Sequence, residues 1–508
     1  MVPDAPRSDV PRSDASGADT SDADVRSAGP VPAELPRGTI SRYALGSIGT
    51  GGFATLPGLV LTYYLTDNLG VTALLAGVIV TVAKIWDVVI DPVVGALTDR
   101  DLARHGTRRR LMLIGALSLP VLFALTFAVP PTLGPAVGAV WVLIAFVLTA
   151  TAFSLFQVPY IALPAELAAR YDTRTTLLTW RVVVLTFAIL LFGAGGPILR
   201  GITGDPTTGY LLMGIVAGVV IGLGMLVATT VAGRAQRRLS GMAAAATSTA
   251  EQAELVAEHV DDPAPRPLGA DATTSSGGIR DNFRSAGDTL RRSQPFRALL
   301  TTFFLQAIAT GLMLAGAQYL ATWVLRDEDA VTFLFVALIA PALLAAPAWG
   351  AVARRIGKER AFAMASILFA AAALSTLFAL WSPGAWLYVS VALAGVAYAG
   401  LQSLPMAMLP DVISHDALRH GPGRAGAFGG VWTAGETAGF ALGATVLSLV
   451  LAATGYLART AGQVVTQPES AVAGIVISFS VVPAALIALS MVSLARYRLR
   501  RDDIDGHR

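Results

Sequence analysis

About twelve long apolar segments, separated by short polar loops, set the pattern of the chain. Each has roughly twenty or more residues, the length at which an α-helix crosses the hydrocarbon core of a bilayer. They lie at Tyr43–Leu65, Thr72–Leu97, Leu111–Val129, Gly134–Leu163, Thr176–Leu199, Tyr210–Ala232, Arg297–Val324, Val331–Val352, Ala361–Leu380, Ala385–Leu409, Ala425–Ala453 and Ala471–Leu494. The pattern predicts an all-α membrane protein with twelve transmembrane helices.

Polar stretches divide these spans into two sets of six. We expect a disordered cytoplasmic tail over 1–40, one six-helix half over 41–232 and a second over 296–496, followed by a short tail over 497–508. Residues 233–295 are rich in Ala, Ser, Thr, Pro and Asp, which predicts a flexible cytoplasmic linker. A short membrane-surface helix over 241–260 is an alternative that its weakly apolar face does not favour.

Basic residues collect in alternate loops. Five arginines lie between spans two and three, four basic residues between spans eight and nine, and two arginines each between spans four and five and spans ten and eleven. The alternate loops hold only Arg200, Arg326 and Arg459. Because cytoplasmic loops of membrane proteins carry an excess of Lys and Arg, both chain ends are expected in the cytoplasm and the protein in the plasma (inner) membrane.

Composition excludes several classes of protein. The chain is 54% hydrophobic and 14% charged, with a mean hydropathy of +0.63, far more apolar than a soluble domain. Its net charge of +3 is explained by the loops, so no nucleic-acid partner is expected. The chain has no cysteine, no phosphate-binding Gly-x-x-x-x-Gly-Lys motif and no cluster of its five histidines. We expect neither enzyme activity nor a cofactor.

Three charged side chains interrupt the second span: Lys84, Asp87 and Asp91. Charge inside a membrane span is costly and typically marks an ion or substrate path. Residues three and four apart share a helix face, so the two carboxylates and the ammonium converge. With about 1.5 Å of rise per residue from Ala73, Asp87 lies roughly 20 Å along a span of about 30 Å. The spacing predicts a cation or proton site. The alternative is a structural Lys84–Asp87 ion pair, with Asp91 and Pro92 capping or kinking the helix end.

A second motif follows the same span and recurs in the other half. Gly95–Arg100 precedes a basic run at His105–Arg110, and Gly350–Arg360 occupies the matching place in the second half. Internal duplication with a site between two halves that rock about it is the architecture of major facilitator transporters. Asp99 and Arg100 are predicted to form a cytoplasmic gate or loop clamp; the alternative is an orientation signal alone.

The residues of the second span also resemble a known family. The run Trp86-Asp87-x-x-x-Asp91-Pro92-x-x-Gly95-x-x-x-Asp99-Arg100 is similar to the signature of the glycoside-pentoside-hexuronide:cation symporters, to which the melibiose permeases belong. Further similar segments are Tyr63–Asp67, Val158–Leu163, Pro410–Asp416 and Phe428–Thr433. The resemblance implies that Asp87 and Asp91 coordinate Na+ or exchange H+, and that this cation is coupled to a sugar-like solute. Hard cations prefer such carboxylate oxygens.

The chain departs from the melibiose permeases where those place other charged groups. Gly51 stands in place of a sugar-binding Asp in span one, Gln157 in place of another in span four, and Thr437, beside Glu436, in place of a Lys in span eleven. Relatives of the family also carry lysolipids, so these departures leave the solute open while the cation pair is intact.

Other polar residues inside the spans are candidates for the solute site. Gln157 precedes Val158-Pro159 and either binds solute or packs between helices. Arg181 either snorkels to the cytoplasm or points toward Asp87 and Asp91. Glu436 is either a protonation site or a partner of Arg181 or Lys84. Hydrogen bonding and stacking add Tyr160, Gln306, Gln318, Tyr319, Trp323, Gln402 and Trp432. Tyr319 and Trp323 alternatively belong to the interfacial belt. The Gly435-x-x-x-Gly439-x-x-x-Gly443 ladder predicts close helix packing.

These observations predict a cation-coupled symporter that works as a monomer in a lipid bilayer, with a small solute and a coupling cation as its partners. The first alternative is a proton-coupled transporter or exporter of lysolipids, amphiphiles or drugs, which an apolar cavity would favour. An alternative of another class is a non-transporting membrane sensor, which would need a defined docking surface in the cytoplasmic linker.

Overall fold

The computed structural model describes residues 35–167, 171–257, 290–420, 425–497 and 499. Twelve spans among these residues are long and apolar enough to cross a membrane, which confirms the predicted fold class. The elements are α1 (Arg37–Leu45), α2 (Ser47–Tyr63), η1 (Tyr64–Asn68), α3 (Ala73–His105), α4 (Arg109–Thr126), α5 (Pro135–Leu167), α6 (Tyr171–Gly201), α7 (Pro206–Ala257), α9 (Gln294–Tyr319), η2 (Leu320–Val324), α10 (Ala330–Ile356), α11 (Lys358–Ser375), η3 (Thr376–Leu380), α12 (Trp386–His420), α13 (Ala425–Ala453), α14 (Glu469–Phe479) and α15 (Val481–Leu494).

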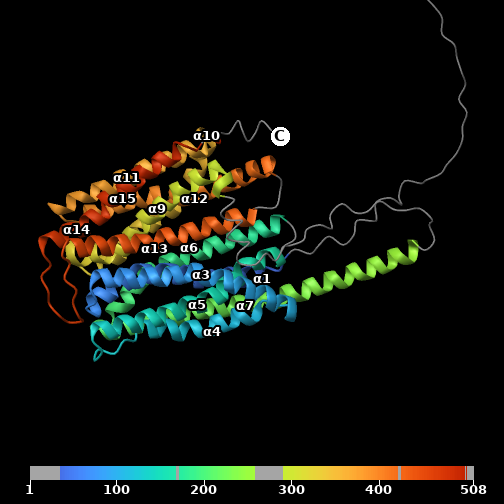
Figure 1. The fold of residues 1–508 in the computed structure, drawn as a ribbon, viewed down its shortest axis with the longest axis horizontal. Helices are drawn as coiled ribbons and strands as arrows, with labels where there is room; N and C mark the ends of the chain where they lie inside the picture. The colour runs from blue at the N-terminus through green and yellow to red at the C-terminus, as the bar shows by residue number, and fades with distance from the viewer. Residues whose placement is uncertain (1–34, 168–170, 258–289, 421–424, 498, 500–508) are drawn as a thin grey trace, which may run out of the picture.

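The helices form two halves, which we call the N-half (α1 to α7) and the C-half (α9 to α15). Figure 1 shows the N-half in blue to green on one side and the C-half in yellow to red on the other. The halves meet mainly along α3 and α13, with further contacts between α2 and α9 and between α6 and α10. A cavity between two such halves is where secondary transporters hold their solutes.

The first span of each half ends in the same unusual way. Helix α2 runs into the five-residue π-helix η1, and α9 runs into the π-helix η2. In η1 the carbonyl of Tyr64 accepts a hydrogen bond from the amide of Leu69 at 3.1 Å, and in η2 the carbonyl of Leu320 accepts one from Leu325 at 3.0 Å. Both bonds join residues five apart. This match supports the internal duplication predicted from the loops.

Small residues let the helices inside each half approach closely. A β-carbon on Gly395 would lie 2.0 Å from the carbonyl oxygen of Leu338, where α12 crosses α10. On α13, β-carbons on Gly439 and Gly443 would fall 2.6 Å from Ala307 Cβ and 2.3 Å from the backbone nitrogen of Leu312 on α9. The predicted packing role of the glycine ladder is therefore confirmed at these two positions.

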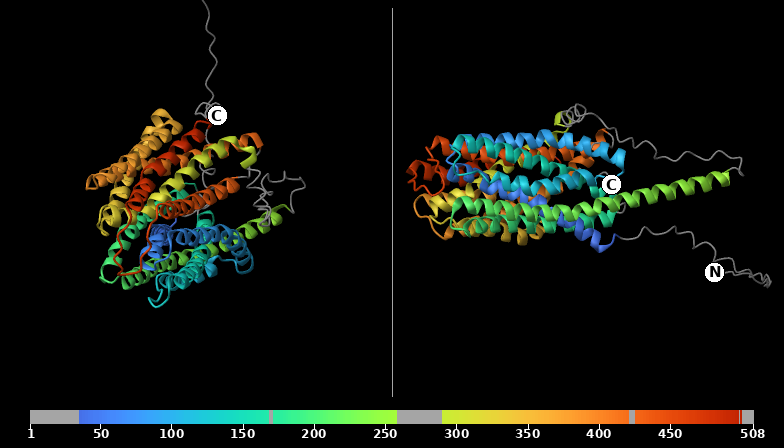
Figure 2. Two further views of the ribbon diagram at one scale, coloured as in Figure 1. Left: turned by 60° about the vertical axis from the view of Figure 1, so that its left-hand side comes forward. Right: turned by 90° about the horizontal axis from the view of Figure 1, so that it is seen from below.

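The sequence did not predict how far α7 extends. Its apolar span ends near Gly233, but the helix continues to Ala257 and projects beyond the bundle (Figure 2). The first part of the expected flexible linker is thus helical, as is the stretch from residue 294 onward. Residues 258–289 of that linker, residues 1–34 of the expected N-terminal tail and all but 497 and 499 of the expected C-terminal tail lie outside the described residues.

The bundle has two different ends. At the basic end, α3 turns into α4 and α10 into α11, beside the clustered arginines. At the opposite end, which we call the sealed end, η1, η2 and residues 454–468 come together; we call 454–468 the sealing loop. Among the described residues, every hydrogen bond between the halves lies toward the sealed end. Apart from those made by the sealing loop, these bonds join Thr81 Oγ1 to Thr445 Oγ1, Thr66 Oγ1 to Tyr319 OH and Thr332 Oγ1 to the Ala194 carbonyl.

Candidate transport site

Lys84, Asp87 and Asp91, the charged residues within the apolar part of α3, lie as their spacing predicts. Lys84 Nζ is 3.0 Å from Asp87 Oδ2, and Asp91 Oδ1 accepts a hydrogen bond from Ser154 Oγ of α5 at 2.6 Å. Asp87 is 9% exposed, and its Oδ1 is buried with no hydrogen-bond partner among the described residues. One oxygen of Asp87 is therefore free beside a second carboxylate one helical turn away.

This arrangement suits a small hard cation. Carboxylate oxygens are the preferred ligands of such ions, and a buried oxygen without a partner is costly to maintain. Part of the structural alternative is also present, because Lys84 and Asp87 do pair. The predicted cap is wrong, since α3 continues through Pro92 to His105, so Asp91 and Pro92 do not end the helix.

Aromatic and hydroxyl side chains hold α3 in this position. Trp86 Nε1 donates a hydrogen bond to Thr151 Oγ1 of α5 at 2.9 Å. The Lys84 ammonium lies 5.7 Å from the ring centroid of Phe53 on α2, and that ring stacks on Phe153 at 4.2 Å. The carboxylate pair is thus fixed against both α2 and α5, which preorganises it for binding.

Gln157 is part-buried and contacts the first span. Its Oε1 accepts a hydrogen bond from Thr50 Oγ1 at 2.8 Å. A β-carbon on the neighbouring Gly51 would lie 2.8 Å from Ala188 Cβ of α6, so a larger side chain does not fit there without movement. Two of the three positions that distinguish this chain from the melibiose permeases, Gly51 and Gln157, are therefore linked through Thr50 by a neutral hydrogen bond, where those proteins carry acids.

Tyr160 is completely buried, and its polar contacts are all with the protein. Its hydroxyl donates to the carbonyl of Tyr43 at 2.8 Å and lies 3.0 Å from Ser47 Oγ. Its ring stacks on those of Tyr43 and Phe156 at 4.7 and 5.1 Å. These contacts favour a role in joining α5 to α1 and α2 over the predicted contact with solute.

We expect Tyr160→Phe to lower stability without changing solute affinity. Removing the hydroxyl leaves the buried carbonyl of Tyr43 without that partner, which costs about 1–3 kcal/mol. Thermal unfolding in detergent should show a lower midpoint, while the uptake KM stays within twofold of wild type. Tyr388→Phe, whose hydroxyl makes no hydrogen bond among the described residues, is the matched control. An unchanged midpoint with a tenfold higher KM would return Tyr160 to the solute site.

Arg181 and Glu436 lie on opposite halves and do not pair with each other. The Arg181 guanidinium lies 5.6 Å from the Tyr160 ring centroid, and its Nε is buried without a hydrogen-bond partner among the described residues. Glu436 on α13 is half-buried and has no ion pair with a described residue. The alternative that Glu436 pairs with Arg181 or Lys84 is therefore not realised here, since Lys84 pairs with Asp87.

Two other predicted solute residues are engaged inside the C-half. Gln306 Nε2 donates to Ser366 Oγ at 3.0 Å and to Ser490 Oγ at 3.1 Å, which ties α9 to α11 and α15. Trp432 is 2% exposed and stacks on Phe303 at 4.4 Å. Gln306 Oε1 and Trp432 Nε1 are nevertheless buried without a hydrogen-bond partner among the described residues, so packing accounts for only part of each side chain. The structure does not bring them together with Gln157 on the N-half.

The predicted gate at the basic end is a local clamp in this structure. Asp99 Oδ1 lies 2.9 Å from Arg108 Nη1, so the pair closes the turn from α3 to α4 within the N-half. Arg100 is exposed. In the C-half, Lys358 Nζ and Asp411 Oδ2 are 2.5 Å apart and join α11 to α12. Neither pair crosses between the halves.

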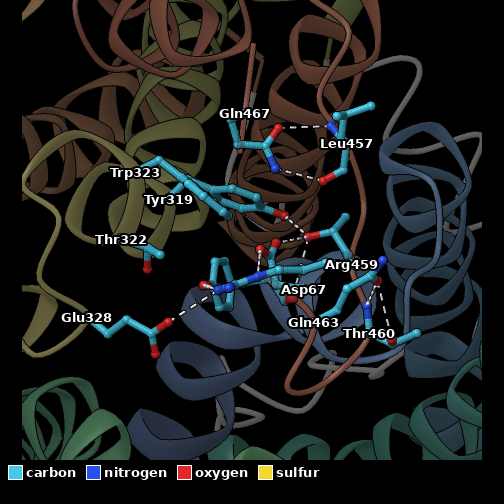
Figure 3. A network of polar contacts seen from close by, with 12 residues as sticks. Asp67, Tyr319, Thr322, Trp323, Glu328, Leu457, Arg459, Thr460, Gln463 and Gln467 are labelled. Carbon is cyan, nitrogen blue, oxygen red and sulfur yellow. Dashed lines mark hydrogen bonds and ion pairs between the residues drawn. The ribbon is translucent and has the colours of Figure 1, made fainter. Parts of the chain in front are cut away.

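A cluster of polar contacts around Asp67 lies at the sealed end, where the sequence predicted no site (Figure 3). Asp67 of η1 accepts hydrogen bonds from Thr66 Oγ1 at 2.7 Å, from the Tyr456 hydroxyl at 2.7 and 2.9 Å and from Arg459 Nε at 3.0 Å. The Asp67 side chain is 1% exposed. Arg459 and Tyr456 belong to the C-half. The ion pair between Asp67 and Arg459 therefore joins the N-half to the sealing loop.

Tyr319 and Trp323, predicted for the cavity or for an interfacial belt, join this cluster instead. The Tyr319 hydroxyl lies 2.7 Å from Thr66 Oγ1, and Trp323 Nε1 donates to the Tyr456 hydroxyl at 2.7 Å. Burial, and then Asp67, raise the pKa of Tyr456, so its hydroxyl stays protonated and donates to the carboxylate. Burial alone would lower the pKa of Arg459, but Tyr63 and Asp67 raise it.

Comparison with known proteins agrees with this architecture. A family model described as MFS/sugar transport protein matches residues 42–261 and 261–501. The symporter sll1374 of Synechocystis is 25% identical, over 90% of this chain and 93% of its own length. A glucuronide carrier protein homolog of Escherichia coli is 23% identical over 91% and 92%. In fold, the chain resembles the E. coli xylose transporter XylE, with a TM-score of 0.56 at 14% identity over 92% of this chain and 98% of that one.

The family model covers almost all the described residues of both halves, and the relatives match over nearly their full lengths. Together with twelve spans and a carboxylate pair in the second, this makes the chain a multi-pass secondary active symporter and excludes an enzyme. The chain belongs to the glycoside-pentoside-hexuronide:cation symporter family of the major facilitator superfamily.

Proposed function

We propose that this protein couples the movement of Na+ or H+ to the uptake of a glycoside-like solute across the plasma membrane. The observation that carries the proposal is the pair Asp87 and Asp91, with a free buried oxygen on Asp87 and Lys84 beside it. A cation held there offsets the charge of two carboxylates inside the membrane. Each elementary charge moved through about 100 mV contributes roughly 2.3 kcal/mol to accumulation.

Support for a sugar-like solute comes from the family and from the polar groups left over in the N-half. The glucuronide carrier homolog, which matches along nearly its whole length, is named for a glycoside. Gln157 with Thr50, and Arg181, are hydrogen-bonding groups near the carboxylate level. From the C-half, Glu436 supplies a carboxylate that has no ion pair within the part of the chain that the structure describes. Such groups recognise sugar hydroxyls.

The remaining parts of the proposal concern the setting. We infer that the basic end, and with it both chain ends, faces the cytoplasm; the excess of arginine in the loops at that end supports this orientation. One chain contains both halves, so a monomer in the bilayer is sufficient for alternating access and no second subunit is required. The coupling ion is the only cofactor that we propose, with Asp87 and Asp91 as its ligands if it is Na+.

The test is uptake into proteoliposomes with imposed Na+ or H+ gradients, using a glucuronide, a neutral glycoside, a pentose disaccharide and a lysolipid as radiolabelled solutes. We expect accumulation of one glycoside well above that of protein-free liposomes, and only when the matching cation gradient is present. Equal accumulation with and without both gradients would contradict coupled symport.

A second candidate is a proton-coupled transporter or exporter of amphiphiles. One observation favours it: the first-span position that carries a sugar-binding acid in melibiose permeases is here the tightly packed Gly51. Under this candidate, only the lysolipid responds in the same assay, and the response follows the H+ gradient.

A further inference from the structure

Four charged side chains at the sealed end are shared equally between the halves. Asp67 and Arg200 belong to the N-half, and Glu328 and Arg459 belong to the C-half. Two of their ion pairs cross between the halves: Arg459 Nε to Asp67 Oδ1 at 3.0 Å and Arg200 Nη2 to Glu328 Oε2 at 3.6 Å. A third pair, Arg459 Nη2 to Glu328 Oε1 at 3.2 Å, lies within the C-half. The four charges therefore form one connected chain.

Backbone contacts hold this chain of charges in register. The Arg459 amide donates to the Thr66 carbonyl at 2.9 Å, and the Ala461 amide donates to the Asn68 carbonyl at 3.0 Å. Leu69 and Thr460 form an antiparallel bridge. The sealing loop of the C-half thus pairs like a short strand with the end of the first span of the N-half (Figure 3).

Burial makes it costly to leave two of these charges, Asp67 and Arg200, without a partner. The side chains of Asp67 and Arg200 are 1% and 7% exposed, so neither reaches bulk water while the sealed end is closed. Arg200 also rests on the rings of Tyr63 and Tyr210, at 5.8 and 5.5 Å from their centroids. A buried charge that loses its partner is strongly unfavourable. Opening this end therefore needs new partners for Asp67 and Arg200.

Each half already carries one acid and one base. If the halves separate here, Asp67 and Arg200 leave together on the N-half, while Glu328 and Arg459 stay together on the C-half, where they are already paired. We propose that these four residues form a partner-exchange lock, paired across the halves when the sealed end is closed and within each half when it opens. They would be positioning residues for alternating access, on which the inference rests, and do not touch the solute.

The proposal makes an unusual prediction for a charge swap. Exchanging Asp67 and Arg459 restores an opposite-charge pair across the closed end. In the open state, however, it places two bases on the N-half and two acids on the C-half. An ordinary structural ion pair would simply be restored by the swap. A partner-exchange lock would be held closed by it.

The experiment measures how often the sealed end opens, without any solute. The chain has no cysteine, so Ser448→Cys provides a single reporter. Ser448 is 1% exposed on α13, and a β-carbon on Gly77 of α3 would lie 2.5 Å from its Cβ, so the site is covered while the halves meet. Purified protein in nanodiscs is treated with a water-soluble maleimide, and the labelling rate is followed by mass.

We expect Arg459→Gln to label at least about tenfold faster than the parent, because Arg459 loses its ion pair with Asp67 across the halves as well as its pair with Glu328. The Asp67→Arg/Arg459→Asp swap should label more slowly than the parent. Adding Arg200→Glu and Glu328→Arg to the swap should bring the rate back, because each half again holds one acid and one base. Arg326→Gln, an exposed arginine between Trp323 and Glu328, is the control and should match the parent.

Two results would overturn the proposal: a swap that labels at the parent rate, which indicates a plain ion pair, or one that labels as fast as Arg459→Gln. Monodisperse elution of every variant confirms that the fold is intact. Since no solute is used, failure of this test leaves the proposed symport standing, and failure of the uptake test leaves the lock untouched.

Discussion

Asp91→Asn is expected to abolish gradient-driven accumulation of the solute while leaving membrane insertion and abundance near wild type. The substitution keeps the shape of the side chain and its hydrogen bond from Ser154 at 2.6 Å, but removes the charge that a cation would balance. Asp87→Asn should have the same effect, because it removes the charge of a carboxylate whose buried Oδ1 has no hydrogen-bond partner among the described residues. Accumulation should fall by at least about tenfold in each variant, as expected when a charged ligand of the coupling ion is lost.

The measurement is uptake in proteoliposomes under Na+ and H+ gradients, with protein amount matched by gel. Asp329→Asn, an exposed acid at the sealed end, is the control and should accumulate solute like wild type. Downhill exchange of solute without a gradient separates loss of coupling from loss of binding. Full accumulation by both Asp87→Asn and Asp91→Asn would remove the cation site from this helix.

The second large effect is expected from Gly395→Val. A β-carbon at this position would lie 2.0 Å from the Leu338 carbonyl oxygen, and a backbone atom of α10 cannot move aside as a side chain could. The α10–α12 contact would have to separate, at a cost of about 1–3 kcal/mol or more. We expect a sharply lower abundance in the membrane and a lower unfolding temperature in detergent.

Gly195→Val is the matched control for that substitution. Gly195 also lies inside a helix, α6, but a β-carbon there would meet nothing within 4 Å. Its abundance and unfolding temperature should stay close to wild type. Equal losses from both substitutions would show that loss of glycine in the helix, not the crossing at Leu338, determines the effect.

The fold could be predicted from the sequence because the membrane leaves few choices. Backbone polar groups must be satisfied inside each span, so length and hydropathy alone identify the helices. All twelve expected spans are present. The extension of α7 past Gly233 could not be predicted in the same way, since outside the bilayer neither hydropathy nor length constrains the chain.

The candidate cation site could also be predicted from the sequence, because Lys84, Asp87 and Asp91 are related by helical spacing alone. The solute residues were harder. Tyr160 and Gln306 are polar residues in apolar spans, and sequence cannot tell a side chain facing a cavity from one facing a hydroxyl of a neighbouring helix. Only the packing decides between these two surroundings.

The cluster at the sealed end was missed for a different reason. Asp67 is separated from Arg459 by nearly the whole chain, and no local pattern joins them. One signal was available: the loops on that side are almost free of arginine, yet Arg200 and Arg459 are present. Because the excess of arginine in cytoplasmic loops does not explain these two residues, each is expected to have a specific partner.

The π-helical turns at the ends of the two first spans have a mechanical consequence. A π turn holds one residue more than an α turn, and one residue corresponds to a rotation of about 100° around a helix axis. If η1 tightened to an α turn, Asp67 would swing away from the sealing loop without any rigid movement of α2. Trp323, at the matching place in η2, would turn in the same sense. Two short changes of register, one in each half, are then sufficient to free both partners of the Tyr456 hydroxyl.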